Sequence, residues 1–84
     1  MPLKIFYFAS LREALGTGGE QLDLPAGITD ISALRAHLAE RGDGWHLLTQ
    51  SKSLRAAVNQ QMVGADARIT DGDEIAFFPP VTGG

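Results

Sequence analysis

The chain of 84 residues contains no cysteine. It therefore has no disulfide, no thiolate nucleophile and no cysteine-ligated metal or iron–sulfur cluster. Any sulfur that this protein handles must be attached to a group other than a thiol. Histidine is also scarce, with only His37 and His46. Because these two lie far apart in the sequence, we expect no metal site and place both at the surface or its boundary.

Three further absences narrow the function. No apolar run approaches the roughly 20 residues that cross a bilayer. The N-terminal segment shows the alternation of a strand and lacks the pattern of a signal peptide. We therefore expect a cytoplasmic protein without a membrane partner. The seven basic residues are scattered and the net charge is -3, which argues against nucleic acid. Neither a GxxxxGK[ST] nor a GxGxxG motif is present, so we expect no cofactor bound by this chain.

The composition that remains is ordinary for one globular domain. Hydrophobic residues make up 44% of the chain and charged residues 20%. A domain of this size buries only about 60–65% of its unfolded surface, so its core is thin. A deep active site is difficult to build on such a core, and a carrying or binding role is more natural.

The first strand is expected at residues 3–9, which are rich in aromatic and branched side chains. Alternation divides them into one face with Leu3, Ile5, Tyr7 and Ala9 and another with Lys4, Phe6 and Phe8. Both faces carry apolar groups, which predicts a central strand in its sheet. A short helical turn is expected at 10–15, with Ser10 as its N-cap. A second strand at 20–25 could pair with the first as an antiparallel hairpin.

Residues 30–41 predict the main helix. Thr29 or Asp30 can cap its start, Ile31, Leu34 and Leu38 form an apolar stripe, and Gly42 is placed to stop it. Arg41 would lie in its last turn.

Beyond the helix, the clearest signals are turns. Residues 43–53 are less readable, although Trp45, Leu47 and Leu48 are expected to cover one end of the core. Two short strands around Asn59 and Gln60 are expected within 54–63, followed by turns at 64–66 and 70–73 and a last strand at 74–78. One helix over a mixed sheet of about five strands is an α+β fold.

The last six residues form an extended tail after a domain at 1–78. Pro79 and Pro80 end the strand and direct the chain away from the sheet. Val81 and Thr82 follow, and Gly83 and Gly84 have no side chains, so they could enter a narrow channel in another protein. The carboxylate of Gly84 is a poor electrophile until ATP converts it to an acyl-adenylate, which a sulfur donor could turn into a thiocarboxylate. A frayed, functionless end is the alternative interpretation.

Three segments, KIFYFASLREALG at 4–16, AAVNQQMV at 56–63 and TDGDEIAFFPPVTGG at 70–84, resemble the ubiquitin-like sulfur-carrier proteins, and among them the small subunits of molybdopterin synthases. The resemblance implies a β-grasp fold and a Gly84 that an E1-like enzyme adenylates with ATP and that is then thiocarboxylated. It further implies that the tail enters a large subunit, within a heterotetramer, and delivers sulfur to cyclic pyranopterin monophosphate. The catalytic side chains would belong to that large subunit.

The aromatic residues suggest where a partner binds. Phe6, Phe8, Phe77 and Phe78 divide over two sheet faces, and aromatics left away from the helix would form an exposed patch. We therefore expect Phe78, with Pro79, Phe8, Met62 and the tail, to contact the large subunit, whereas burial of all four phenylalanines is the alternative. The acidic residues Asp71, Asp73 and Glu74 fit a turn better than acid–base chemistry, and Arg12 fits a solvated surface position.

Three other functions stay open on the sequence. The first is a sulfur carrier for thiamine or another thio-product, since such carriers also end in Gly-Gly. The second is a ubiquitin-like modifier that forms isopeptide bonds with lysines. The third is an interaction domain with an inert tail.

Overall fold

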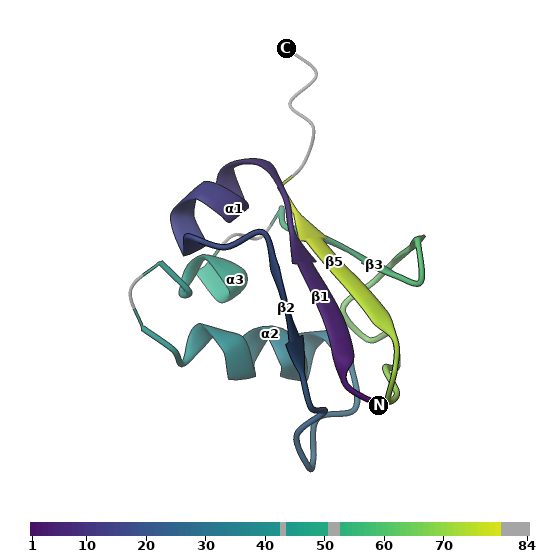
Figure 1. Ribbon diagram of the computed structural model, residues 1–84. Helices are drawn as coiled ribbons and strands as arrows, with labels where there is room; N and C mark the ends of the chain where they lie inside the picture. The colour runs from purple at the N-terminus through teal and green to yellow at the C-terminus, as the bar shows by residue number, and fades with distance from the viewer. Residues whose placement is uncertain (43, 51–52, 80–84) are drawn as a thin grey trace.

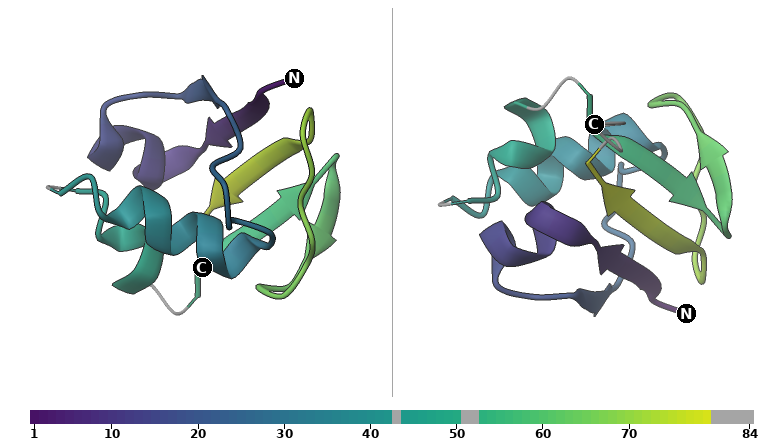
Figure 2. Two further views of the ribbon diagram at one scale, coloured as in Figure 1. Left: turned by 90° about the horizontal axis from the view of Figure 1, so that it is seen from below. Right: turned by 90° about the horizontal axis from the view of Figure 1, so that it is seen from above.

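The computed structural model describes residues 1–42, 44–50 and 53–79. These residues form a five-stranded mixed sheet with helices packed against one face (Figures 1 and 2). In chain order the elements are β1 (Leu3–Tyr7), α1 (Ala9–Leu15), β2 (Gly19–Leu22), α2 (Ile31–Ala39), α3 (Leu47–Gln50), β3 (Arg55–Val58), β4 (Gln61–Val63) and β5 (Glu74–Phe78). The predicted α+β architecture, with one main helix on a mixed sheet, is confirmed.

The sheet has the strand order β2-β1-β5-β3-β4, so β5 is its central strand. Strands β1 and β5 run parallel, and the pairs β1–β2, β3–β5 and β3–β4 are antiparallel. The first strand was predicted to be central; it does have a neighbour on each side, β2 and β5, although the middle of the sheet is β5. Its antiparallel pairing with the second strand is confirmed. The first strand stops at Tyr7, two residues before its predicted end, because Ala9 adopts a φ of 56° and turns the chain out of the sheet.

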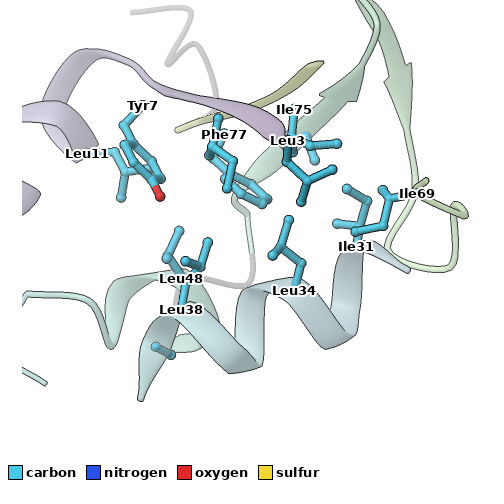
Figure 3. Packing of buried hydrophobic residues seen from close by; sticks show 13 residues of the cluster. Leu3, Tyr7, Leu11, Ile31, Leu34, Leu38, Leu48, Ile69, Ile75 and Phe77 are labelled. Carbon is cyan, nitrogen blue, oxygen red and sulfur yellow. The ribbon is translucent and has the colours of Figure 1, made fainter. Parts of the chain in front are cut away.

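The core lies between the sheet and α2 (Figure 3). Strand alternation directs Ile5, Tyr7, Ile75 and Phe77 toward the helix, and each is at most 1% exposed. From below, α2 contributes its predicted stripe of Ile31, Leu34 and Leu38, which is equally buried. The helix therefore fixes which of the two sheet faces is covered.

Both long helices differ from prediction at their ends. The N-cap of α1 is Phe8 rather than Ser10, because the Phe8 carbonyl already accepts the N–H groups of Leu11 and Arg12, and no side chain caps the helix. In α2, Asp30 is the N-cap, as predicted, and accepts from the Ala33 N–H at 2.8 Å. This helix ends at Ala39, so Arg41 lies in the turn that follows and not in the last helical turn.

The segment that was least readable in the sequence contains the short helix α3. Leu48 is fully buried and Trp45 is half-buried, as predicted, but Leu47 is 38% exposed, so its assignment to the core was wrong. Consecutive residues of a helix point in different directions, and only one of the two leucines can face the core. Because α3 packs against α2, it is Leu48 that faces inward.

The predicted turns are confirmed. Asn59 and Gln60 connect β3 to β4 with φ values of 51° and 71°, the left-handed pair that a tight two-residue hairpin requires. Asp73 closes the turn before β5: its N–H donates to the Thr70 carbonyl at 3.1 Å and its carboxylate accepts from the Thr70 N–H at 2.9 Å. These turns set the register in which β5 enters the sheet.

Candidate functional site: the carboxyl-terminal exit and the open sheet face

The central strand β5 carries the chain to its carboxyl-terminal exit. Phe77 is fully buried, whereas Phe78 and Pro79 are half-buried. The N–H of Phe8 donates to the Phe77 carbonyl at 3.1 Å, so pairing with the first strand extends to the end of β5. The strand ends before Pro79, as predicted, since proline has no N–H for the ladder. The other predicted tail residues, Pro80, Val81, Thr82, Gly83 and Gly84, lie outside the described residues.

The face of the sheet opposite α2 is free of helices in the part of the chain that the structure describes (Figure 2). We call it the open face and define it by Phe6, Phe8, Ala57, Met62, Ala76 and Phe78. Five of them follow from strand register, because they alternate along their strands with residues that face the core or lie opposite such open-face residues on the next strand. Phe8 follows β1, and its ring stacks on that of Phe6. The open face thus runs across four strands and reaches the residue from which the tail departs.

A row of four residues crosses the centre of the open face. Phe6 is opposite Ala76, Ala76 is opposite Ala57, and Ala57 is opposite Met62. Neighbouring strands are about 4.8 Å apart, so Phe6 and Met62 stand roughly 14 Å apart with two small residues between them. The row is therefore apolar throughout, with two small side chains at its centre and a large one at either end.

Two exposed aromatic side chains lie at and beside the β1 end of this row: Phe6 forms that end, and Phe8 lies beside the end of β5. Phe8 is 49% exposed and Phe6 is 37% exposed, and their rings stack with centroids 6.3 Å apart. Met62, at the far end of the row, is 59% exposed. Of the four phenylalanines only Phe77 is fully buried, so the alternative that all four are core is wrong. Large apolar groups gathered on one exposed face are typical of a protein-binding surface.

Other candidates from the sequence have structural roles or lie at the surface. Asp73 belongs to the turn described above, and Asn59 donates to it from Nδ2 at 3.1 Å, while the Asn59 amide oxygen accepts from the N–H of Glu74. Asp71 and Arg12 are exposed. His46 is exposed and His37 is half-buried, as expected. Within residues 1–42, 44–50 and 53–79, no three histidine or acidic side chains gather as a metal ligand set would.

No sequence pattern pointed to the polar cluster that ties β2 to the turn after α2. Arg41 donates to both carboxylate oxygens of Glu20, at 2.6 and 2.9 Å, and the Tyr7 hydroxyl donates to the same carboxylate at 2.9 Å. The Arg41 guanidinium also lies 4.5 Å from the centroid of the Trp45 ring. The hydrogen bonds from Arg41 lower the pKa of Glu20, and burial raises the pKa of Tyr7. Glu20 is therefore held as an anion and Tyr7 as a neutral donor.

A pocket also escaped prediction. It has a volume of about 420 Å³ and lies between α2 and the point where the chain leaves β4. Its lining includes Ile31 and Arg35 of α2, residues 54–56 and residues 62–65. Because Arg55 is paired with Phe78 in the sheet, the pocket lies at the same end of the sheet as the tail exit. No sequence signal could find it, because it forms only where three separate segments meet.

Comparison with known proteins decides the family. The sequence matches the ThiS family over residues 5–84. The chain belongs to the ThiS family. It is 46% identical to the molybdopterin synthase sulfur carrier subunit of Escherichia coli and 42% identical to that of Haemophilus influenzae, in each case over 98% of this chain and 99% of the relative. Membership in the family of sulfur-carrier subunits, expected from the three sequence segments, is thereby confirmed.

Solved structures agree with this assignment. A putative molybdopterin converting factor subunit 1 from Pyrococcus furiosus matches with a TM-score of 0.76 and 27% identity, over 96% of this chain and 99% of that one. A chain from the protein–protein complex of subunits 1 and 2 of molybdopterin-converting factor from Helicobacter pylori matches with a TM-score of 0.64 and 25% identity, over the whole of both chains. The predicted ubiquitin-like β-grasp fold is confirmed for this ThiS-family chain.

Among the described residues, the helices are too short or too polar to cross a bilayer.

Proposed function

We propose that this chain is the sulfur carrier subunit of a molybdopterin synthase and that Gly84 is the attachment point of the sulfur. The observation that carries the proposal is near-identical length and 46% identity to a subunit of that name, with the family match running through Gly84. The absence of cysteine agrees with it, because a carrier without a thiol must use a carboxyl group.

The proposed chemistry has two steps before transfer. The Gly84 carboxylate attacks the α-phosphate of ATP in an E1-like enzyme, which releases pyrophosphate and leaves an acyl-adenylate. A sulfur donor then displaces AMP, and the terminus becomes a thiocarboxylate. Each charged carrier gives one sulfur to cyclic pyranopterin monophosphate, so two carriers complete one dithiolene. The carrier supplies the reacting terminus and binds no cofactor, while the enzyme that activates it binds the ATP.

We propose that the partner in transfer is the large synthase subunit, in a heterotetramer that contains two carriers, and that the complex acts in the cytoplasm. The open face is the surface that suits such a partner, because Phe8 and Phe78 lie beside the tail exit. A protein seated there would receive Pro79 and the tail in its own active site. The solved complex of the two Helicobacter pylori subunits shows that a chain similar to this one assembles with a second subunit.

The proposal is tested by deletion of Gly84. Purified carrier, activating enzyme, sulfur donor and large subunit are combined, and molybdopterin is measured as product. Deletion should abolish product while the folded carrier still binds the large subunit, because the domain at 1–78 and the open face are unchanged. Product formation by the deleted chain would contradict the proposal.

A second candidate is a sulfur carrier for thiazole formation in thiamine synthesis, and the match to the ThiS family is compatible with it. Binding of the purified chain to a thiazole synthase and to a large molybdopterin synthase subunit, measured side by side, separates the two. Binding to the large subunit alone supports the leading function.

A further inference from the structure

The pocket between α2 and β4 has a basic lining in an acidic protein. Arg35 and Arg55 both line it, and none of the described residues that line it is acidic. The chain as a whole carries a net charge of -3. Two of its five arginines therefore border one cavity, while the remaining lining is apolar or glycine.

The two arginines differ in how they are held. Arg35 is half-buried, and its Nε donates to the Leu48 carbonyl at 2.6 Å, which fixes the plane of the guanidinium. Burial lowers the pKa of Arg35 and so disfavours its charged form, an effect that a nearby anion would oppose. Arg55 is exposed, and it forms no ion pair with any of the residues that the structure describes.

This pocket is continuous with the open face. Arg55 pairs with Phe78, which belongs to the open face, and Met62 belongs both to that face and to the lining. A protein that covers the row from Phe6 to Met62 would therefore reach the mouth of the pocket at its edge. An apolar centre bordered by charged groups is the usual layout of a protein–protein interface.

We propose that the pocket accepts an acidic side chain, Asp or Glu, of the partner protein that covers the open face. The carboxylate would pair with Arg55 and approach Arg35, while the neighbouring part of the partner packs on the apolar lining near Ile31 and Val63. Planar guanidinium groups bind carboxylates through paired hydrogen bonds, which gives orientation as well as attraction. The pair would fix the angle at which the partner meets the tail exit. This inference rests on the proposed function, since it takes the large subunit as that partner.

The test measures binding of the purified large subunit by calorimetry at about 50 mM and about 300 mM salt, a range over which charge pairs near a surface are progressively screened. The variants are Arg55→Gln and Arg35→Gln. Arg68→Gln is the matched control, because it makes the same change in net charge at an exposed arginine that does not line the pocket. A thermal melt of each variant monitors folding, since Arg35→Gln also removes the bond to Leu48.

We expect Arg55→Gln to weaken binding about 5-fold to 30-fold at low salt and to reduce the dependence of affinity on salt. Arg35→Gln should act in the same direction, and Arg68→Gln should change neither quantity by more than about 2-fold. If Arg35→Gln fails to fold, Arg55→Gln decides alone. Wild-type affinity and salt dependence in Arg55→Gln, or an equal loss in Arg68→Gln, would overturn this inference and leave the proposed function intact. Failure of the wild-type chain to bind the large subunit would instead overturn the proposed function.

Discussion

Phe8→Ala tests the open face most sharply. Phe8 is 49% exposed, and a phenylalanine presents about 200 Å² of surface, so roughly 100 Å² is available to a partner. At about 25 cal/mol per Å², covering it is worth at most about 2.5 kcal/mol, which corresponds to about 60-fold in affinity. Because alanine keeps part of this area, we expect the large subunit to bind the variant between about 10-fold and about 60-fold more weakly.

The same substitution should change folding little. The N–H of Phe8 still donates to Phe77, and its carbonyl still accepts from the first turn of α1. The side chain loses its stacking on Phe6, which is worth about 1 kcal/mol. The assay pairs calorimetric titration of the large subunit with a thermal melt of the free carrier.

The matched control for Phe8→Ala is Leu47→Ala. Leu47 is a comparably exposed apolar side chain, at 38%, but it belongs to α3 on the helix side of the sheet. Its removal should leave binding unchanged. Unchanged binding by a folded Phe8→Ala variant, or an equal loss in Leu47→Ala, would refute the assignment of the open face as the partner surface.

Three further predictions concern stability. Glu20→Gln should cost about 1 kcal/mol of stability at neutral pH through loss of the ion pair with Arg41. Because Arg41 depresses the pKa of Glu20 in the folded state, this difference from wild type should shrink as the pH falls below about 4.3. Urea titrations of both proteins at neutral pH and below that pH check it, and a difference that stays constant would contradict it. Phe77→Ala should lose about 3–5 kcal/mol by leaving a cavity in the core, and a melt close to that of wild type would argue against its burial. Asp30→Ala should cost about 1 kcal/mol in the same assay through loss of the cap on the Ala33 N–H, whereas no loss would mean that the cap is not needed.

The parts of the fold that the sequence predicted well are those bounded by strong local signals. The strand at 74–78 was predicted with its observed limits, because an Asp-Gly turn precedes it and a proline follows it. The hairpin at Asn59 and Gln60 and the cap at Asp30 are likewise local. Each depends on a few adjacent residues whose backbone preferences agree.

The parts that were missed depend on contacts between distant residues. Glu20 and Arg41 are 21 positions apart, and nothing in either segment indicates the other. The choice between Leu47 and Leu48 depends on how α3 docks on α2. Alternation separated Phe77 from Phe78, but only the position of α2 shows which of them is buried. The pocket at Arg35 and Arg55 needs three segments in place before it exists.

The central claim is that Gly84 carries sulfur, and intact-mass spectrometry of the carrier tests it most directly. The purified chain is incubated with its activating enzyme, ATP and a sulfur donor, and a second sample omits ATP. The account predicts an ATP-dependent mass increase equal to the exchange of one oxygen for one sulfur, located by fragmentation at Gly84. A mass that stays that of the free carboxylate in the complete mixture, with the enzyme shown to be active, would contradict the claim.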